Sequence, residues 1–146
     1  FQRAYARSHG MDSIALRLAT VMNPGVDNWS RIIETIDDPD TIFVRELSLR
    51  EYLWQYVHVE DAVQGLTLSV KHLEANPGLG FDTFNIGAAD NISSVPTLEL
   101  IARYFPETPM VKHPKRFVDE PTTALYGIDK ARRVLGYEPQ FTWRDQ

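Results

Sequence analysis

The sequence contains no cysteine among its 146 residues. This absence excludes disulfides, zinc–thiolate sites and cysteine nucleophiles, and it is compatible with a reducing compartment. We therefore expect a cytoplasmic protein. The histidines are scattered without the spacing of a metal site, so no metal is expected; they are His9, His58, His72 and His113.

Two further classes of protein are disfavoured by what is missing. No apolar run approaches 18 residues, so no transmembrane helix and no membrane partner is predicted. The net charge of −5 is opposite to the basic surface that nucleic-acid binders usually carry. A hydrophobic content of 43% with 24% charged residues is typical of a globular protein with a substantial core.

The N-terminal part predicts a helix followed by a strand. Residues 13–20 read SIALRLAT, in which every second residue is strongly apolar, as expected for a strand with one buried face. A helix is expected over 2–9, with Gly10 placed to end it in the left-handed conformation. Arg17 lies between apolar neighbours in the strand, so we expect it to be buried in an ion pair.

The middle of the chain predicts a strand, a helix and a strand. We expect strands over 52–59 and 81–86, with a helix over 61–73 between them. This order is typical of a βαβ unit and a parallel sheet. Asp61 is interpreted as the cap of the helix. His58, between two valines, is interpreted as a structural histidine rather than an acid or base.

The remaining elements predict a separate lobe rich in loops, and an interface between two lobes is a natural ligand cleft. They are helices over 28–36, 97–105 and 130–135, and strands over 41–47 and 110–111.

Four segments resemble, in the same order, motifs of the extended short-chain dehydrogenase/reductase superfamily, the NAD-dependent epimerase/dehydratase group. They cover nearly the whole chain, which makes the resemblance specific for the family and weak for the substrate. The segments are Arg3–Asp12 with Leu16-Arg17, Val21 and Pro24-Gly25; Tyr56-Val-His-Val-Glu-Asp61-Ala; Phe84-Asn-Ile-Gly87; and Asp129–Gly136 with Tyr-Glu-Pro139.

The resemblance implies an α/β fold, namely the C-terminal part of a Rossmann-type NAD(P)-binding fold with a small α+β substrate-binding lobe. The implied division is 1–27 and 53–90 for the Rossmann-type part, and 28–52 and 91–146 for the substrate lobe. The family's glycine-rich phosphate loop and catalytic Tyr-x-x-x-Lys pair are expected upstream of Phe1, in the N-terminal half of a longer protein. We expect this chain to hold neither, and no catalytic residue.

The resemblance also implies where ligands are held. NAD or NADP would be bound mainly by the N-terminal half, with contributions from the end of the first strand, where open α/β sheets place their ligands. The implied cofactor residues are Ala19, Thr20 and Val21, and the implied substrate residues are Thr20, Met22, Trp54 and Arg116.

Trp54 stands where sugar-nucleotide members of the family commonly have an arginine for the diphosphate. An indole cannot form the forked, charge-assisted bonds of a guanidinium, which counts against a sugar nucleotide. Arg45, Arg50 or Arg116 are alternative cations. The basic cluster 112–116 is either a solvated loop or an anion-binding wall of the cleft.

Two functions remain open from the sequence. The first is a portion of an NAD(P)-dependent epimerase/dehydratase-like oxidoreductase that acts on a sugar-derived or other hydroxyl/carbonyl substrate and is inactive without its N-terminal half. The alternative is a non-catalytic dinucleotide-binding sensor or scaffold of the same fold. The expected partners are the small-molecule substrate, the N-terminal half and a second copy in a homodimer, since an unpaired strand edge favours association.

Overall fold

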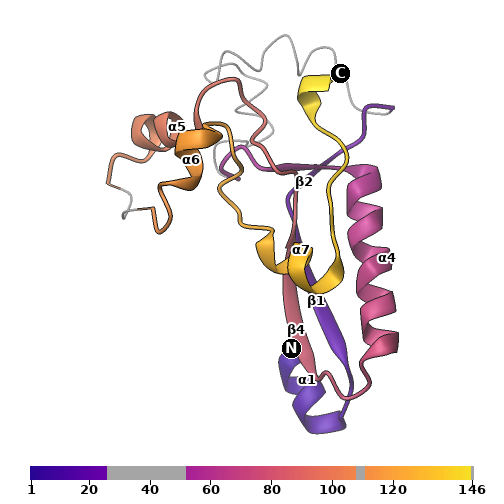
Figure 1. Cartoon of the computed structure of the whole chain (residues 1–146). Coiled ribbons are helices and arrows are strands. Elements are labelled where there is room, and N and C mark those ends of the chain that lie inside the picture. Colours follow the sequence, from indigo (N-terminus) through magenta and orange to yellow (C-terminus); the bar gives the residue numbers. More distant parts are fainter. Residues whose placement is uncertain (26–51, 108–110, 146) are drawn as a thin grey trace.

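The computed structural model describes residues 1–25, 52–107 and 111–145 (Figure 1). The predicted helix over 28–36 and strand over 41–47 lie outside the described residues, as do Arg45 and Arg50. The predicted strand over 110–111 lies partly outside them.

Two pairs of parallel strands form the centre of the fold. Strand β1 (Ser13–Leu18) pairs with β4 (Phe81–Ile86), and β2 (Thr20–Met22) pairs with β3 (Tyr56–His58). Ala19 lies between β1 and β2, and its amide still donates to Ile86 O at 3.0 Å. The first strand therefore changes partner from β4 to β3 at Ala19. Parallel strands joined by a helix confirm the predicted α/β class.

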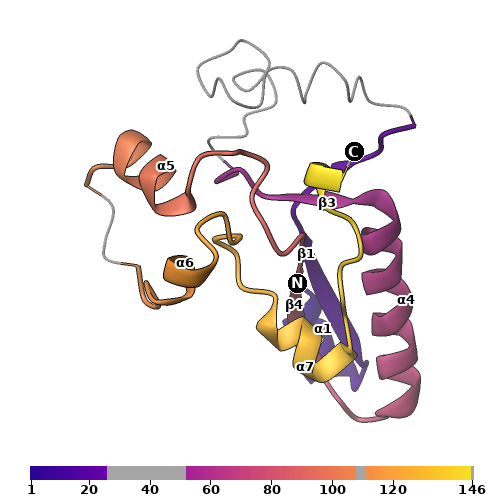
Figure 2. The same cartoon turned by 45° about the horizontal axis from the view of Figure 1, so that its top comes forward.

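Helices cover the β1–β4 pair, and two more lie away from it in both views (Figures 1 and 2). The first group is α1 (Gln2–His9), α4 (Val59–Ala75) and α7 (Asp129–Leu135), and the second is α5 (Thr97–Tyr104) and α6 (Arg116–Asp119). A short 3₁₀ helix over Trp143–Asp145 follows. The prediction for α1 is confirmed, since Gly10 ends it with φ 64°. No described helix is long and apolar enough to cross a membrane.

The strand predicted over 52–59 is wrong at both ends. Residues 52–54 form a turn in which Leu53 and Trp54 have φ values of 56° and 54°, so the extended backbone begins only at Tyr56. The helix then starts at Val59, two residues earlier than predicted. Left-handed residues other than glycine have no clear sequence signal, which is why apolar alternation through the turn was misleading.

His58, and not Asp61, caps the N-terminus of α4. Its Nδ1 accepts a hydrogen bond from the amide of Glu60 at 3.2 Å, and its ring stacks on Phe141 with centroids 4.0 Å apart. The interpretation of His58 as structural fits this arrangement. An acceptor role requires Nδ1 to be unprotonated.

The prediction that Asp61 is a helix cap is wrong. Its carboxylate is 1% exposed and accepts the amides of Gln140 and Phe141 at 2.8 and 3.1 Å. It therefore fastens the C-terminal segment to the start of α4. These partners lie about 80 residues further along the chain, beyond the reach of a local pattern.

Helix α4 packs mainly through small residues, and Leu68 is a partly buried apolar residue that packs against the core. Val63, Leu66 and Val70 are 54%, 50% and 55% exposed, whereas Ala62 is buried. A Cβ added to Gly65 would lie only 2.9 Å from Cγ2 of Ile86 in β4. The absence of a side chain at Gly65 thus lets α4 approach the sheet closely.

Two apolar clusters make up the core of the described residues. One joins β2, β3 and α5, and its buried members are Met22, Trp54, Tyr56, Ala88, Ile92 and Leu100. The other joins the sheet to α4 and α7, and its buried members are Ala19, Val57, Ala62, Phe84, Ile86, Ile128, Ala131, Leu135 and Tyr137. Ala19, where the first strand changes partner, belongs to the second cluster, and Met22 at the end of β2 belongs to the first.

Candidate functional site

A cavity opens where β1 and β4 end. Beyond Ala19 the strand continues beside β3, and the chain after β4 is tied to the same strand because the Ala88 amide donates to Tyr56 O at 2.8 Å. The resulting strand-end cavity has a volume of about 450 Å³. Its described lining residues are Arg17, Leu18, Ala19, Tyr52, Gln55, Asn85 and Tyr126. The carboxyl ends of parallel strands are the usual place for ligands in open α/β sheets.

Two amide side chains hold the walls of the strand-end cavity in place. Asn85 on β4 donates from Nδ2 to Gly127 O at 3.1 Å. Gln55, only 1% exposed, donates to Leu53 O at 3.2 Å and accepts the amide of Tyr126 at 3.4 Å. The loop that carries Tyr126 is thereby tied both to β4 and to the turn before β3.

Arg17 does not behave as the sequence predicted. We expected a buried ion pair, but the residue is exposed, and no described carboxylate forms an ion pair with it. Its Nη2 donates to Thr83 Oγ1 at 3.3 Å. The alternation in β1 correctly separates Arg17 from its apolar neighbours, but the last two residues of the strand, Arg17 and Leu18, are both exposed.

The three residues predicted to contact a cofactor lie at this strand end, but only Ala19 lines the cavity. Ala19 is 9% exposed, Thr20 is half-buried, and Val21 is 43% exposed. Their role in binding a cofactor stays a prediction.

The predicted substrate residues are divided between the core and the surface. Met22 and Trp54 are each 2% exposed and belong to the core, with the Trp54 ring 5.3 Å from that of Tyr104. In this structure neither offers a surface to a ligand. Arg116 lines a smaller cavity of about 250 Å³ that shares Tyr126 with the strand-end cavity. Its Nη1 is 3.8 Å from Oδ2 of Asp129.

One Tyr-x-x-x-Lys spacing does occur in the chain, at Tyr126 and Lys130, so the expectation that there is none was wrong. The two residues do not share a helix, since Tyr126 precedes α7 and Lys130 lies within it. The ammonium of Lys130 is bonded to Asp82 and to Thr83 O and lies over the Phe84 ring. Lys130 is therefore engaged with β4, and the match to the catalytic motif is one of spacing alone.

The ion pair with Lys130 also governs the pKa of Asp82. Partial burial alone would raise the pKa of this carboxyl, but the hydrogen bonds from the Lys130 ammonium and the Thr83 amide lower it below its ordinary value. Asp82 thus remains ionised and holds α7 against the sheet.

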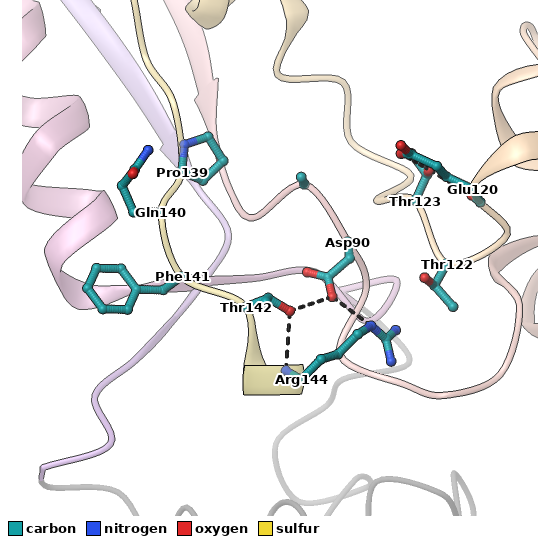
Figure 3. A pocket seen from close by; sticks show the side chains of 10 residues that line it. Asp90, Glu120, Thr122, Thr123, Pro139, Gln140, Phe141, Thr142 and Arg144 are labelled. Carbon is teal, nitrogen blue, oxygen red and sulfur yellow. Dashed lines mark hydrogen bonds and ion pairs between the residues drawn. The ribbon is translucent and has the colours of Figure 1, made fainter. Parts of the chain in front are cut away.

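A second hollow of about 420 Å³ lies beside the C-terminal segment, and Figure 3 shows Asp90 between Thr142 and Arg144. Asp90 accepts the hydroxyl of Tyr56 at 2.7 Å, that of Thr142 at 2.9 Å, and Nε of Arg144 at 3.0 Å. The amide of Trp143 donates to the Tyr56 hydroxyl at 3.0 Å.

The pKa of Tyr56 is strongly raised, first by burial and then by the neighbouring Asp90 carboxylate. The phenol is therefore a neutral hydrogen-bond donor in a structural network, not a proton-transfer group. Sequence reasoning missed this network, since the hydrogen bonds of the Tyr56 hydroxyl link residues 34 and 87 positions apart.

Among the described residues, no group of three or more histidine or acidic side chains could hold a metal ion.

The residues that sequence reasoning missed at the strand end are Tyr52, Gln55, Asn85 and Tyr126. Only Asn85 had a usable signal, because it lies near the end of a predicted strand.

Comparisons with known proteins point to epimerases. The chain is 31% identical over 85 residues to a UDP-glucose 4-epimerase of Mycoplasma pneumoniae, which covers 58% of the chain and 25% of that protein. It is 26% identical to the uncharacterized UDP-glucose epimerase YtcB of Bacillus subtilis, over 97% of the chain and 44% of that protein. No family model matches the chain.

The fold is similar to a crystal structure of a UDP-galactose 4-epimerase, with a TM-score of 0.52 and 22% identity, over 97% of the chain and 45% of that structure. The chain thus spans between a quarter and a half of the length of the relatives it matches. The expected resemblance is confirmed: in sequence and in fold, the chain resembles part of an enzyme of the NAD-dependent epimerase/dehydratase group within the extended short-chain dehydrogenase/reductase superfamily.

Proposed function

We propose that the chain is the C-terminal portion of an NAD(P)-dependent epimerase/dehydratase-like oxidoreductase. The observation that carries the proposal is the cavity at the carboxyl ends of β1 and β4, where the first strand changes partner at Ala19. This is the position at which α/β sheets bind nucleotides. Similarity to epimerases over most of the chain supports the same conclusion.

The residues of the chain fit one end of a dinucleotide site. Ala19 and Leu18 give the cavity an apolar wall, and Asn85 and Arg17 give it polar groups. NAD(P), when bound, supplies hydride transfer, and the protein binds and orients it. Because the chain has no glycine-rich phosphate loop, the pyrophosphate would be held by a segment outside it. Thr20 and Val21 would extend the same strand edge toward the ligand.

The proposed substrate is a small molecule with a hydroxyl or carbonyl group, of which a sugar derivative is the first choice because the relatives are named as UDP-glucose epimerases. Arg116 and the cavity it lines would form part of the substrate side. Catalysis would require a Tyr-x-x-x-Lys pair on one helix, in a segment outside the chain. The homodimer and a cytoplasmic location belong to the same proposal.

A binding experiment tests whether most contacts to the dinucleotide lie outside this chain. The whole protein that contains this chain is titrated with NAD and NADP, followed by tryptophan fluorescence, and the chain alone is titrated in parallel. We expect the whole protein to bind at least one of them, and the chain alone to bind it at least a hundredfold more weakly, because most cofactor contacts lie outside it. Equally tight binding by the chain alone, or none by the whole protein, would refute the proposal.

A non-catalytic sensor or scaffold of the same fold would also bind the dinucleotide. The decisive residue is the tyrosine of the Tyr-x-x-x-Lys pair outside the chain. Turnover of UDP-glucose to UDP-galactose by the whole protein, or reduction of NAD(P) with another sugar-derived substrate, favours the enzyme. Dinucleotide binding without a Tyr-x-x-x-Lys pair favours the sensor.

A further inference from the structure

The strand-end cavity has one charged group among its described lining residues, the guanidinium of Arg17. No described carboxylate neutralises it, and its hydrogen bond to Thr83 Oγ1 at 3.3 Å uses only one of its N–H donors. A guanidinium has five such donors arranged in a planar fork. Most of the donors of Arg17 therefore remain available to a ligand or to water.

The position of Arg17 favours a ligand over simple solvation. It lies on β1 directly opposite Asn85 on β4, and both residues line the strand-end cavity. Inside a partly enclosed cavity the effective dielectric constant is lower than in bulk water, so an ion pair with a ligand is stronger.

The remaining walls suit a small anionic molecule. Tyr52 and Tyr126 also line the cavity, are 53% and 39% exposed, and each carries a hydroxyl donor. None of the described lining residues carries a negative charge that would repel an anion. A volume of about 450 Å³ is within the range of small-molecule sites.

We propose that the strand-end cavity binds the oxyanion of a small ligand, a phosphate or carboxylate group, through the guanidinium of Arg17. The inference rests on the proposed function only in that it concerns the same cavity. Arg17 would then determine the specificity of the cavity for anionic over neutral ligands. The forked geometry of the side chain matches two oxygens of either group at once.

The test is a titration of the ¹⁵N-labelled chain with inorganic phosphate and, separately, with sodium acetate, with total ionic strength held constant by sodium chloride. We expect saturable amide shifts at Leu18, Ala19 and Tyr126 with at least one of the two anions. Saturation by phosphate alone assigns a phosphoryl ligand, and saturation by acetate assigns a carboxylate. Absence of saturable shifts at these amides with both anions overturns the inference.

Three variants make the test specific for Arg17. In Arg17→Gln the apparent affinity should fall at least tenfold, and in Arg17→Lys it should fall several-fold, because the charge is kept but the fork is lost. Arg133→Gln is the matched control, since Arg133 is exposed on α7 and outside the cavity, and its affinity should equal that of the wild type. Equal weakening in Arg133→Gln and Arg17→Gln would show a general charge effect and would also overturn the inference.

The Arg17→Lys variant and the wild-type shift map keep the test decisive even where Arg17→Gln fails to fold. The outcome is separable from that of the proposed function. Anion binding by the chain without dinucleotide binding by the whole protein would support the inference and refute the proposed enzyme. Dinucleotide binding by the whole protein without anion binding by the chain would overturn the inference and leave the proposed enzyme supported.

Discussion

Replacing Asp61 by asparagine should detach the C-terminal segment from α4 and lower the stability of the whole chain. The buried Asp61 carboxylate accepts two backbone amides, from Gln140 and Phe141, at 2.8 and 3.1 Å. Asparagine is nearly isosteric, but only its oxygen can accept, so one of the two amides faces an N–H₂ group and loses its partner. Hydrogen bonds to a charged group contribute about 1.5–3 kcal/mol each.

We therefore expect Asp61→Asn to lower the free energy of unfolding by about 2–3 kcal/mol, measured by urea denaturation. The melting temperature should fall by about 4–10 °C for a chain of this size. Hydrogen exchange of the Gln140 and Phe141 amides should accelerate more than that of amides in the middle of α4.

The matched control is Glu60→Gln, because Glu60 is exposed in the same first turn of α4. It removes the same favourable interaction with the helix dipole, worth about 0.3–1 kcal/mol, without touching the C-terminal segment. If the two variants differ by less than about 0.5 kcal/mol, a size usual for surface substitutions, Asp61 does not fasten that segment and the reasoning is refuted.

Three further predictions concern the packing around the sheet. Gly65→Val should lower the free energy of unfolding by about 1–3 kcal/mol through a clash with Ile86. The control Thr67→Val, on the exposed side of α4, should have little effect. Equal urea midpoints for the two variants would contradict the close approach of α4 to the sheet. Tyr137→Phe removes a buried donor to Gly87 O at 3.0 Å and should lower the free energy of unfolding by about 1 kcal/mol, with the exposed Tyr5→Phe as the unaffected control. Because the folded-state pKa of Asp82 is lowered, its stabilisation is present at neutral pH and is lost as the pH falls through that pKa. The difference in unfolding free energy between wild type and Asp82→Asn should be at most about 1 kcal/mol at neutral pH and shrink as the pH falls through the lowered pKa of Asp82, and a difference that grows on acidification would refute the assignment.

The sequence predicted the regular elements well where the signal was local. Apolar alternation identified β1, the strand over 81–86 was expected where β4 lies, and Gly10 identified the end of α1, because these signals are set by neighbouring residues. The turn at Leu53 and Trp54 was missed, since nothing in the sequence requires left-handed backbone at these two residues. Trp54 was consequently placed on a strand, whereas it lies in the turn, with its side chain buried in the core.

The site was predicted less well than the fold, because it is built by contacts between distant segments. The family resemblance led to Ala19, which does line the cavity, but Gln55 and Tyr126 are brought there by a hydrogen bond across 71 residues. Arg17 was assigned to the interior from its apolar neighbours, yet the last two residues of β1, Arg17 and Leu18, are both exposed at the end of the strand. The partner of Asp61 was likewise unforeseeable from the first turn of α4.

The central claim is that this chain supplies the strand-end portion of a dinucleotide-dependent enzyme whose phosphate loop and catalytic pair lie outside it. Reading the coding sequence upstream of the codon for Phe1 tests it most directly. We predict a glycine-rich phosphate loop between a strand and a helix, and a Tyr-x-x-x-Lys pair on a helix close to Phe1. An upstream coding sequence with neither motif would contradict the account.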